Sequence, residues 1–184
     1  QICEKFLSSA EKFAKSDDVL SEIYCKKGNV SVLQGIGGLE QATKFFKEGS
    51  RLDANRVEAL EGMILCQINE GLYDDAEGQI DLLNVMYSAD ELSPEFYFLK
   101  SLSVKRRVNR DDGGEHLACL DECRKRFVLR SKKAPSKFPF DSFANSSPDF
   151  LLRLAEEYMY YTDGNGISVT LFSSQLGSNN RESA

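Results

Sequence analysis

The sequence lacks an apolar run long enough to cross a membrane. Its strongest apolar stretch, residues 62–66, ends at Gln67, well short of the roughly 20 residues that a membrane-spanning helix needs. Near Gln1 there is no basic flank followed by an apolar stretch, so no signal peptide is recognisable. We expect no transmembrane segment. Because the chain begins with Gln1 and not with methionine, we also expect a fragment of a longer protein.

Cysteine and histidine are scarce as well. Five widely spaced cysteines cannot all pair, which favours a reducing compartment. The single histidine, His116, would have to serve any nucleophile pair, and no acid is identifiable as its partner. His116, Cys119 and Cys123 share one face of an expected helix, but a structural zinc site needs four ligands and no fourth is evident. We expect no metal, no cofactor and buried cysteines in the core.

Motifs for phosphate binding and for carboxylate catalysis are also missing. Residues 35–38 read Gly-Ile-Gly-Gly, but the third glycine of a dinucleotide fingerprint and the Gly-Lys-Ser/Thr of a P-loop are absent. This segment is therefore expected to be a turn between helices. The carboxylate pairs Asp74-Asp75 and Glu156-Glu157 are adjacent on expected helices and so point to different sides. Solvated helix faces explain both pairs.

Charge is distributed unevenly along the chain. Residues 1–96 contain 18 acidic and 9 basic side chains, residues 97–137 contain 5 and 12, and residues 138–184 contain 6 and 2. The overall net charge of −6 gives no general attraction for nucleic acid, and we expect none to bind. The middle segment holds a candidate site for docking to an acidic protein or lipid surface, although a solvated helix end is the simpler interpretation. The candidate site, called the basic cluster below, comprises Arg124, Lys125, Arg126 and Arg130.

What the sequence does contain is a repeat with a period of 34 residues. Three pairs of small residues recur at this distance: Gly28 and Gly62, Gly37 and Gly71, and Ala42 and Ala76. Such a unit is expected to be two antiparallel helices, with glycine at the turn and alanine where the helices cross. A glycine inside a helix costs about 1 kcal/mol relative to alanine. Gly28 and Gly62 therefore predict places where neighbouring backbones pack too closely for a methyl group.

Caps and amphipathic spacing position eight helices. Ser93-Pro94-Glu95 and Ser147-Pro148-Asp149 each supply an N-cap, a proline at the first helical position and an acid in the first turn. The expected helices cover residues 2–15, 18–34, 38–51, 55–69, 72–87, 94–108, 114–131 and 148–161. The predicted fold is all-α, a tetratricopeptide-repeat α-solenoid of about three helix pairs plus an additional helix.

The same signals divide the chain into segments. Residues 1–131 are expected to form tetratricopeptide-like repeats, 132–146 a linker loop, 147–161 the additional helix of the array, and 162–184 a disordered tail. The additional helix carries one apolar stripe, part of which is expected to await a following repeat. The stripe comprises Phe150, Leu151, Leu154, Tyr158 and Tyr161.

A peptide clamp of the kind that some tetratricopeptide repeats use is not expected. That clamp holds two carboxylates with asparagine and lysine side chains on the first helices of the pairs. Between Val57 and Ile68 there is neither asparagine nor lysine, and the charged residues are Glu58 and Glu61.

Two segments carry a more specific resemblance. The first contains Ala59-Leu60-Glu61-Gly62-Met63-Ile64-Leu65-Cys66-Gln67, Glu70-Gly71 and Asp75-Ala76-Glu77-Gly78-Gln79-Ile80-Asp81-Leu82-Leu83-Asn84, and the second contains Ser147-Pro148-Asp149-Phe150-Leu151-Leu152 and Glu157-Tyr158. In this order they resemble the tetratricopeptide repeat protein 21 family, the large tetratricopeptide-repeat subunit of intraflagellar transport complex A. The resemblance spans about residues 20–162 and is strongest at 57–84 and 148–158.

The resemblance implies a non-enzymatic scaffold that serves retrograde ciliary transport and cargo entry into cilia. Its implied partners are the other complex A subunits and neighbouring repeats of the same protein. Its implied location is the cilium or flagellum, the ciliary base and the cytoplasm. Two alternatives remain open. One is a tetratricopeptide adaptor of another multiprotein assembly, recognised by what co-purifies, and the other is a helical enzyme using carboxylates, recognised by tight small-molecule binding in a thermal-shift screen.

Overall fold

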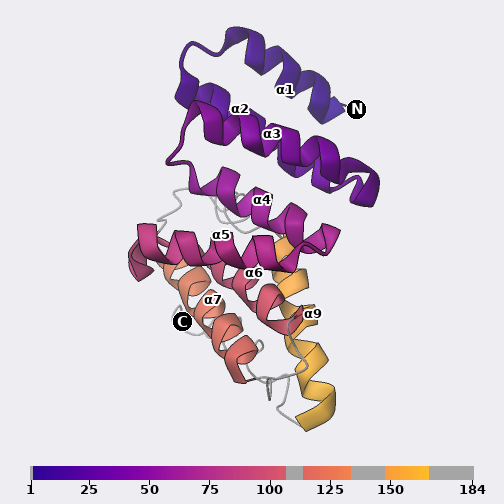
Figure 1. Cartoon of the computed structure of the whole chain (residues 1–184), viewed down its shortest axis with the longest axis vertical. Helices are drawn as coiled ribbons and strands as arrows, with labels where there is room; N and C mark the ends of the chain where they lie inside the picture. The colour runs from indigo at the N-terminus through magenta and orange to yellow at the C-terminus, as the bar shows by residue number, and fades with distance from the viewer. Residues whose placement is uncertain (1, 107–113, 134–147, 166–184) are drawn as a thin grey trace, which may run out of the picture. The chain divides into compact units, whose positions relative to one another are not determined.

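The computed structural model describes residues 2–106, 114–133 and 148–165, which form eight α-helices, two short 3-10 helices and no strand (Figure 1). The α-helices are α1 (Ile2–Phe13), α2 (Asp17–Val32), α3 (Leu39–Leu52), α4 (Val57–Glu70), α5 (Tyr73–Met86), α6 (Pro94–Arg106), α7 (Gly114–Lys133) and α9 (Pro148–Asn165). This confirms the predicted all-α solenoid. None of the described helices is both long enough and apolar enough to span a bilayer.

The helix boundaries agree closely with the expected ones, and two helices run further. α7 continues to Lys133 and α9 to Asn165, past the predicted ends at 131 and 161. The remainder of the predicted linker and tail, 134–147 and 166–184, lies outside the described residues. The chain divides into two compact units, residues 1–119 and 120–184.

In the first unit the helices stack as the 34-residue period predicts. Each helix from α1 to α5 contacts the next, and in addition α2 contacts α4 and α4 contacts α6. The first helices of successive pairs therefore lie beside one another, and α3 and α5 lie nearer the viewer in Figure 1. Ala42 and Ala76 are fully buried in two separate core clusters, which confirms their predicted place in the interior.

Phe46 of α3 explains both mid-helix glycines. A Cβ atom on Gly28 of α2 would lie 2.6 Å from the Phe46 ring, and one on Gly62 of α4 would lie 2.3 Å from it. The fully buried ring fills the space that both glycines leave. The prediction of a backbone neighbour was therefore wrong, because the neighbour is an aromatic side chain from the intervening helix. One period later, Ile80 of α5 stands in the position of Phe46, and Phe96 of α6 stands in the position of Gly62. The aromatic ring of the next repeat therefore comes from α6 and not from α5.

Gly62 and Gly78 make opposite predictions for substitution by alanine. Gly62→Ala should lower the free energy of unfolding by about 1–3 kcal/mol, because the new methyl group overpacks against Phe46. Gly78 lies in α5, is exposed, and has nothing within 4 Å of an added Cβ atom. Gly78→Ala should therefore raise the free energy of unfolding by up to about 1 kcal/mol. Urea denaturation measures both, and changes of the same sign would contradict this account.

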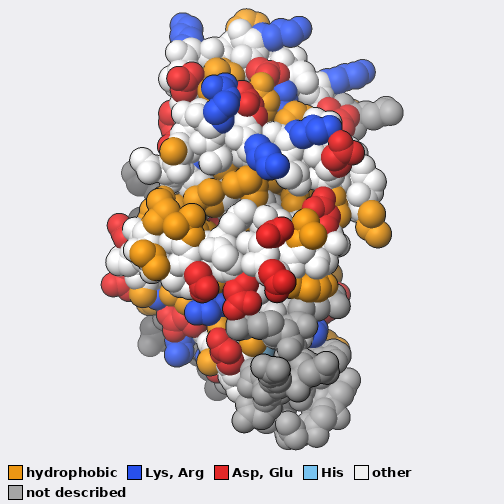
Figure 2. All heavy atoms as spheres, in the orientation of Figure 1, with side chains coloured by type: hydrophobic (Ala, Val, Ile, Leu, Met, Phe, Trp, Pro, Cys, Tyr) orange, Lys and Arg blue, Asp and Glu red, His pale blue; other side chains and the backbone are white. Residues whose placement is uncertain are grey.

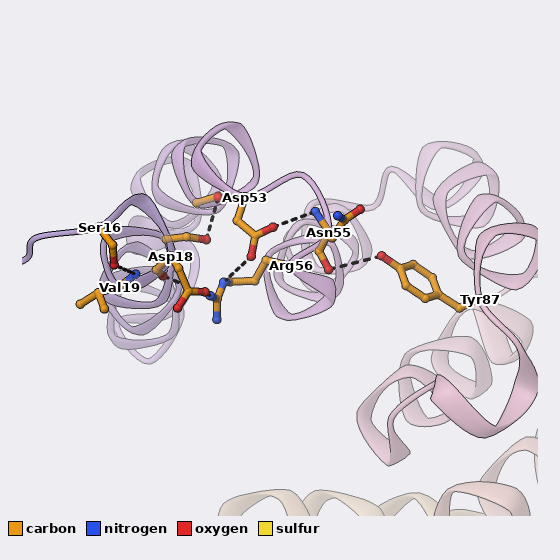
Figure 3. Close-up of polar contacts among 9 residues, drawn as sticks. Ser16, Asp18, Val19, Asp53, Asn55, Arg56 and Tyr87 are labelled. Carbon is orange, nitrogen blue, oxygen red and sulfur yellow. Dashed lines mark hydrogen bonds and ion pairs between the residues drawn. The ribbon is translucent and has the colours of Figure 1, made fainter.

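A polar network joins the turn between α3 and α4 to helix ends on both sides (Figure 3). Arg56 donates to the carboxylate of Asp18 at the start of α2, and its Nε atom lies 3.3 Å from Asp53 Oδ2. Asp53 Oδ1 accepts from the backbone amide of Asn55 at 3.0 Å, and Tyr87 Oη donates to the Asn55 carbonyl oxygen at 3.3 Å. The network therefore connects two successive helix pairs at one edge of the first unit.

Glu11 attaches α1 to α2. Its carboxylate accepts a hydrogen bond from Tyr24 Oη at 2.6 Å and pairs with Lys27 Nζ at 2.5 Å. No described residue of α1 is buried, so these contacts carry much of its attachment. The hydrogen bond from Lys27 lowers the pKa of Glu11, and the hydrogen bond to Glu11 raises the pKa of Tyr24 to about 12.

The attachment of α1 should depend on pH. Because folding lowers the pKa of Glu11, its stabilising contribution is present above the unfolded-state pKa and is lost as pH falls through the folded-state value. We expect the hydrogen-exchange protection factors of the α1 amides, which correct for the slower intrinsic exchange in acid, to fall below about pH 4 while those of α4 remain high. Glu11→Gln should produce the low protection factors of α1 already at pH 7. Equal protection of α1 in both proteins at pH 7 would contradict the role of Glu11.

In the second unit α9 packs against α7 through its apolar stripe. The rings of Phe150 and Phe127 stack with centroids 6.0 Å apart, and Tyr158 Oη donates to Asp121 Oδ1 at 2.9 Å. Burial, followed by the hydrogen bond to Asp121, raises the pKa of Tyr158. Phe150 and Tyr158 are therefore partly covered by α7, while Tyr161 lies beyond the described side chains. Among the described side chains of α9, Leu152 and Met159 are large, apolar and exposed.

Candidate protein-interaction site

The predicted basic cluster lies on α7, within the second unit. Acidic residues one turn earlier on the same helix pair with three of its four members. Arg126 Nε donates to Glu122 Oε1 at 2.8 Å, and Lys125 Nζ lies 3.7 Å from Glu122 Oε2. Arg124 Nε lies 3.7 Å from Asp121 Oδ1. The cluster is therefore partly neutralised within its own helix, which the acidic residues three and four positions earlier in the sequence already indicate.

The four members of the cluster differ in their exposure to solvent. Lys125 is 62% exposed at its side chain, whereas Arg124 and Arg126 are only 23% and 15% exposed. Arg130 is exposed, and its guanidinium lies 5.5 Å from the centre of the Phe127 ring. Residues 121–130 contain four basic and two acidic side chains, a net charge of +2. Lys125 and Arg130 are thus the members that are best placed to meet an acidic partner.

Sequence reasoning missed a polar contact between the first helices of two pairs. Glu58 Oε1 on α4 accepts hydrogen bonds from Lys26 Nζ at 2.9 Å and from Asn29 Nδ2 at 3.2 Å, both on α2. Lysine and asparagine are the residue types of a carboxylate clamp, and here they lie on α2, the first helix of the preceding pair. A carboxylate of the same protein, Glu58, already accepts a hydrogen bond from each of them.

The histidine and the two cysteines that share one face of α7 are buried. His116 Nδ1 lies 2.8 Å from the carbonyl oxygen of Ser101 on α6, and a carbonyl oxygen only accepts, so Nδ1 carries the proton. This contact ties the first turn of α7 to α6 within the first unit. Cys119 and Cys123 are buried as expected. In the described part of the chain, no group of three or more histidine, cysteine or acidic side chains is arranged to hold a metal ion.

The glycine-rich segment and the carboxylate pairs occupy a turn and solvated helix faces. Residues Gly35–Gly38 form a 3-10 helix between α2 and α3, which confirms the predicted turn. Asp74 and Asp75 are both exposed, as is Glu156. Gly71 ends α4 with φ of 82°, a left-handed conformation that favours glycine. The arrangement offers extended helical surfaces and no converging set of chemical groups among these residues.

Stacked helix pairs with small residues buried between them define a helical-repeat protein of the tetratricopeptide type. The family model described as "Tetratricopeptide repeat protein 21 second ARM domain" matches residues 1–176. The chain belongs to the tetratricopeptide repeat protein 21 family, as the resemblance of residues 57–84 and 148–158 predicted.

Individual relatives agree with this assignment. Tetratricopeptide repeat protein 21B of Homo sapiens is 27% identical over 160 residues, which cover 87% of this chain and 12% of that protein. Tetratricopeptide repeat protein 21B of Mus musculus is 26% identical over 158 residues, and tetratricopeptide repeat protein 21A of Mus musculus is 28% identical over 123 residues. The chain covers 12% of the length of the 21B relatives and 9% of the length of mouse 21A.

Proposed function

We propose that this chain is part of a non-enzymatic scaffold subunit of intraflagellar transport complex A, which supports retrograde transport and cargo entry in cilia. The observation that carries the proposal is the family match over residues 1–176. In this role the chain binds the other complex A subunits and neighbouring repeats of its own protein. It acts in the cilium or flagellum, at the ciliary base and in the cytoplasm, through surfaces instead of catalytic residues.

The first helix supports the part of the proposal that concerns neighbouring repeats. Ile2, Phe6 and Phe13 are 73%, 73% and 79% exposed. At 100° per residue they lie on one side of α1 and form a single apolar stripe. Repeat proteins bury such stripes against the next unit of the stack. A preceding helical repeat of the same protein is therefore the proposed cover for this stripe.

Co-purification tests the proposed function. A tagged full-length protein should recover the other complex A subunits, and its loss should leave cargo accumulated at ciliary tips because return transport fails. Recovery of a different multiprotein assembly would favour the adaptor alternative. Recovery of no complex A subunit would overturn the proposal.

The basic cluster makes a separate prediction within this proposal. Reversing Lys125 and Arg130 to glutamate should weaken at least one partner contact several-fold, and the wild-type contact should weaken as salt is raised. Quantitative co-purification at low and high salt measures both effects. The matched control is Lys47→Glu, which reverses an exposed charge on α3. Wild-type recovery by the Lys125 and Arg130 variant would show that the cluster is a solvated face.

A further inference from the structure

One face of α5 exposes an apolar stripe that the repeat fold does not require. Leu82, Val85 and Met86 are 52%, 86% and 51% exposed. Spacings of three and four residues place them on the same side of the helix. In Figure 2, hydrophobic side chains gather on the visible face of the molecule in the region where Figure 1 draws α4 and α5.

The matching positions of the preceding repeat show that this stripe is a local feature. One period earlier, on α3, Leu82 and Val85 correspond to Glu48 and Arg51. Those two side chains form an ion pair, with Arg51 Nη2 donating to Glu48 Oε1 at 2.6 Å. The outward face of a second helix is therefore compatible with charged residues in this array, and α5 has apolar residues where α3 has an ion pair.

Gly78 lies on the same stripe, and no residue that the structure describes explains why this position is a glycine. Gly28 and Gly62 make room for the Phe46 ring, but an added Cβ atom on Gly78 would meet nothing within 4 Å. One period earlier the position is Lys44, which pairs with Glu40 at 2.6 Å. A glycine in the middle of an exposed helix lowers helix stability by about 1 kcal/mol and leaves the backbone open to close approach by a second helix.

The part of the chain that carries the stripe is acidic. Residues 57–99 contain ten acidic side chains and no lysine, arginine or histidine. On α5 itself Asp74, Asp75 and Asp81 are exposed. Asp75 lies in line with the stripe, and Asp74 and Asp81, seven residues apart, follow one edge of it. A segment that covers this face therefore meets apolar contacts along the centre and negative charge beside them.

We infer that the face of α5 formed by Gly78, Leu82, Val85 and Met86 docks a basic amphipathic helix from a partner protein. The inference deepens the proposed scaffold function and rests on it. Apolar side chains of the partner helix cover the stripe, its backbone approaches α5 at Gly78, and its lysine or arginine side chains meet Asp74, Asp75 and Asp81. The complementary charges predict an association that weakens as salt is raised.

A photo-crosslinking residue at position 85 of the full-length protein tests the inference. Val85 is 86% exposed, so the substitution leaves the core untouched. After irradiation of the purified assembly at low salt, mass spectrometry should identify a crosslinked segment of another polypeptide. We expect lysine or arginine residues in that segment together with apolar residues at spacings of three and four. The same crosslinker at position 51, the matching position on α3, should not capture it.

Three changes should lower the crosslinking yield from position 85 by about tenfold or more. They are charge reversal by Asp74→Lys with Asp81→Lys, obstruction by Gly78→Leu, and a rise in salt. Glu40→Lys with Lys44→Glu, an exchange of charges on α3, should leave the yield unchanged.

The outcomes separate this inference from the proposed function. A crosslink to an acidic or neutral segment, to a second copy of this chain, or to nothing overturns the inference, even where complex A subunits still co-purify. Absence of complex A subunits overturns the proposed function. The segment captured from position 85 still decides whether the face takes a basic helix.

Discussion

Replacing Phe46 with alanine is expected to lower the free energy of unfolding of this chain by about 3–5 kcal/mol. The Phe46 ring is fully buried, and it lies between Gly28 of α2 and Gly62 of α4. Neither glycine has side-chain atoms that can move into the space that the ring leaves. The cavity should therefore persist, which places the cost toward the upper end of the range.

Urea denaturation followed by circular dichroism measures this cost, with Phe45→Ala as the matched control. Phe45 is the next residue on α3 and is half-buried, with its ring centroid 6.1 Å from that of Tyr24. Its loss removes less buried surface and should cost clearly less. Equal destabilisation by the two substitutions would show that Phe46 does not join three helices in the way described.

Ala76→Glu is expected to prevent stable folding at neutral pH. Ala76 is fully buried in the cluster that α4, α5 and α6 share. A carboxylate placed there loses its hydration, and residues 57–99 contain no lysine or arginine to pair with it. The expected cost is several kcal/mol, comparable to the whole stability of a small domain.

The pH dependence of this variant tests the reason for the loss. Burial raises the pKa of an unpaired carboxyl group, so the charge-related part of the destabilisation should shrink as pH falls toward about 4. Asn84→Glu, which adds the same charge at an exposed position of α5, should change stability by less than about 0.5 kcal/mol. A melting temperature of Ala76→Glu that matches the unsubstituted chain would refute the assigned burial.

The positions of the helices were predictable because their signals are local. Ser93 accepts from the amide of Phe96 at 2.9 Å and Pro94 begins α6, as the sequence of that cap predicts. Gly71 ends α4 at a positive φ, as its place in the period predicts. Each signal involves residues within a few positions of one another, so the chain itself determines the geometry between them.

Contacts across helices were not predictable from the same signals. Gly28 and Gly62 predicted that another group packs closely against their helices, but the sequence did not identify that group as the Phe46 ring. Glu58 meets Lys26 and Asn29, which are 32 and 29 residues away in the chain. Such pairings depend on how far each helix is rotated about its axis in the stack, which amphipathic spacing fixes only to within a face.

The central aromatic ring comes from α3 where α2, α3 and α4 meet, and from α6 where α4, α5 and α6 meet. This difference has a consequence for the loss of a whole repeat. Deleting residues 39–72 would remove one period and place Gly28 beside Ile80 and Phe96. In the intact chain Gly62 holds that position relative to Ile80 and Phe96, so the combination of side chains is unchanged. Deleting residues 57–90 also removes one period, but it would bring Phe46 to Phe96 and place two rings where the array holds one. The deletion of 39–72 is thus compatible with the packing, and the equally long deletion of 57–90 is not. The repeats of this array are therefore not interchangeable.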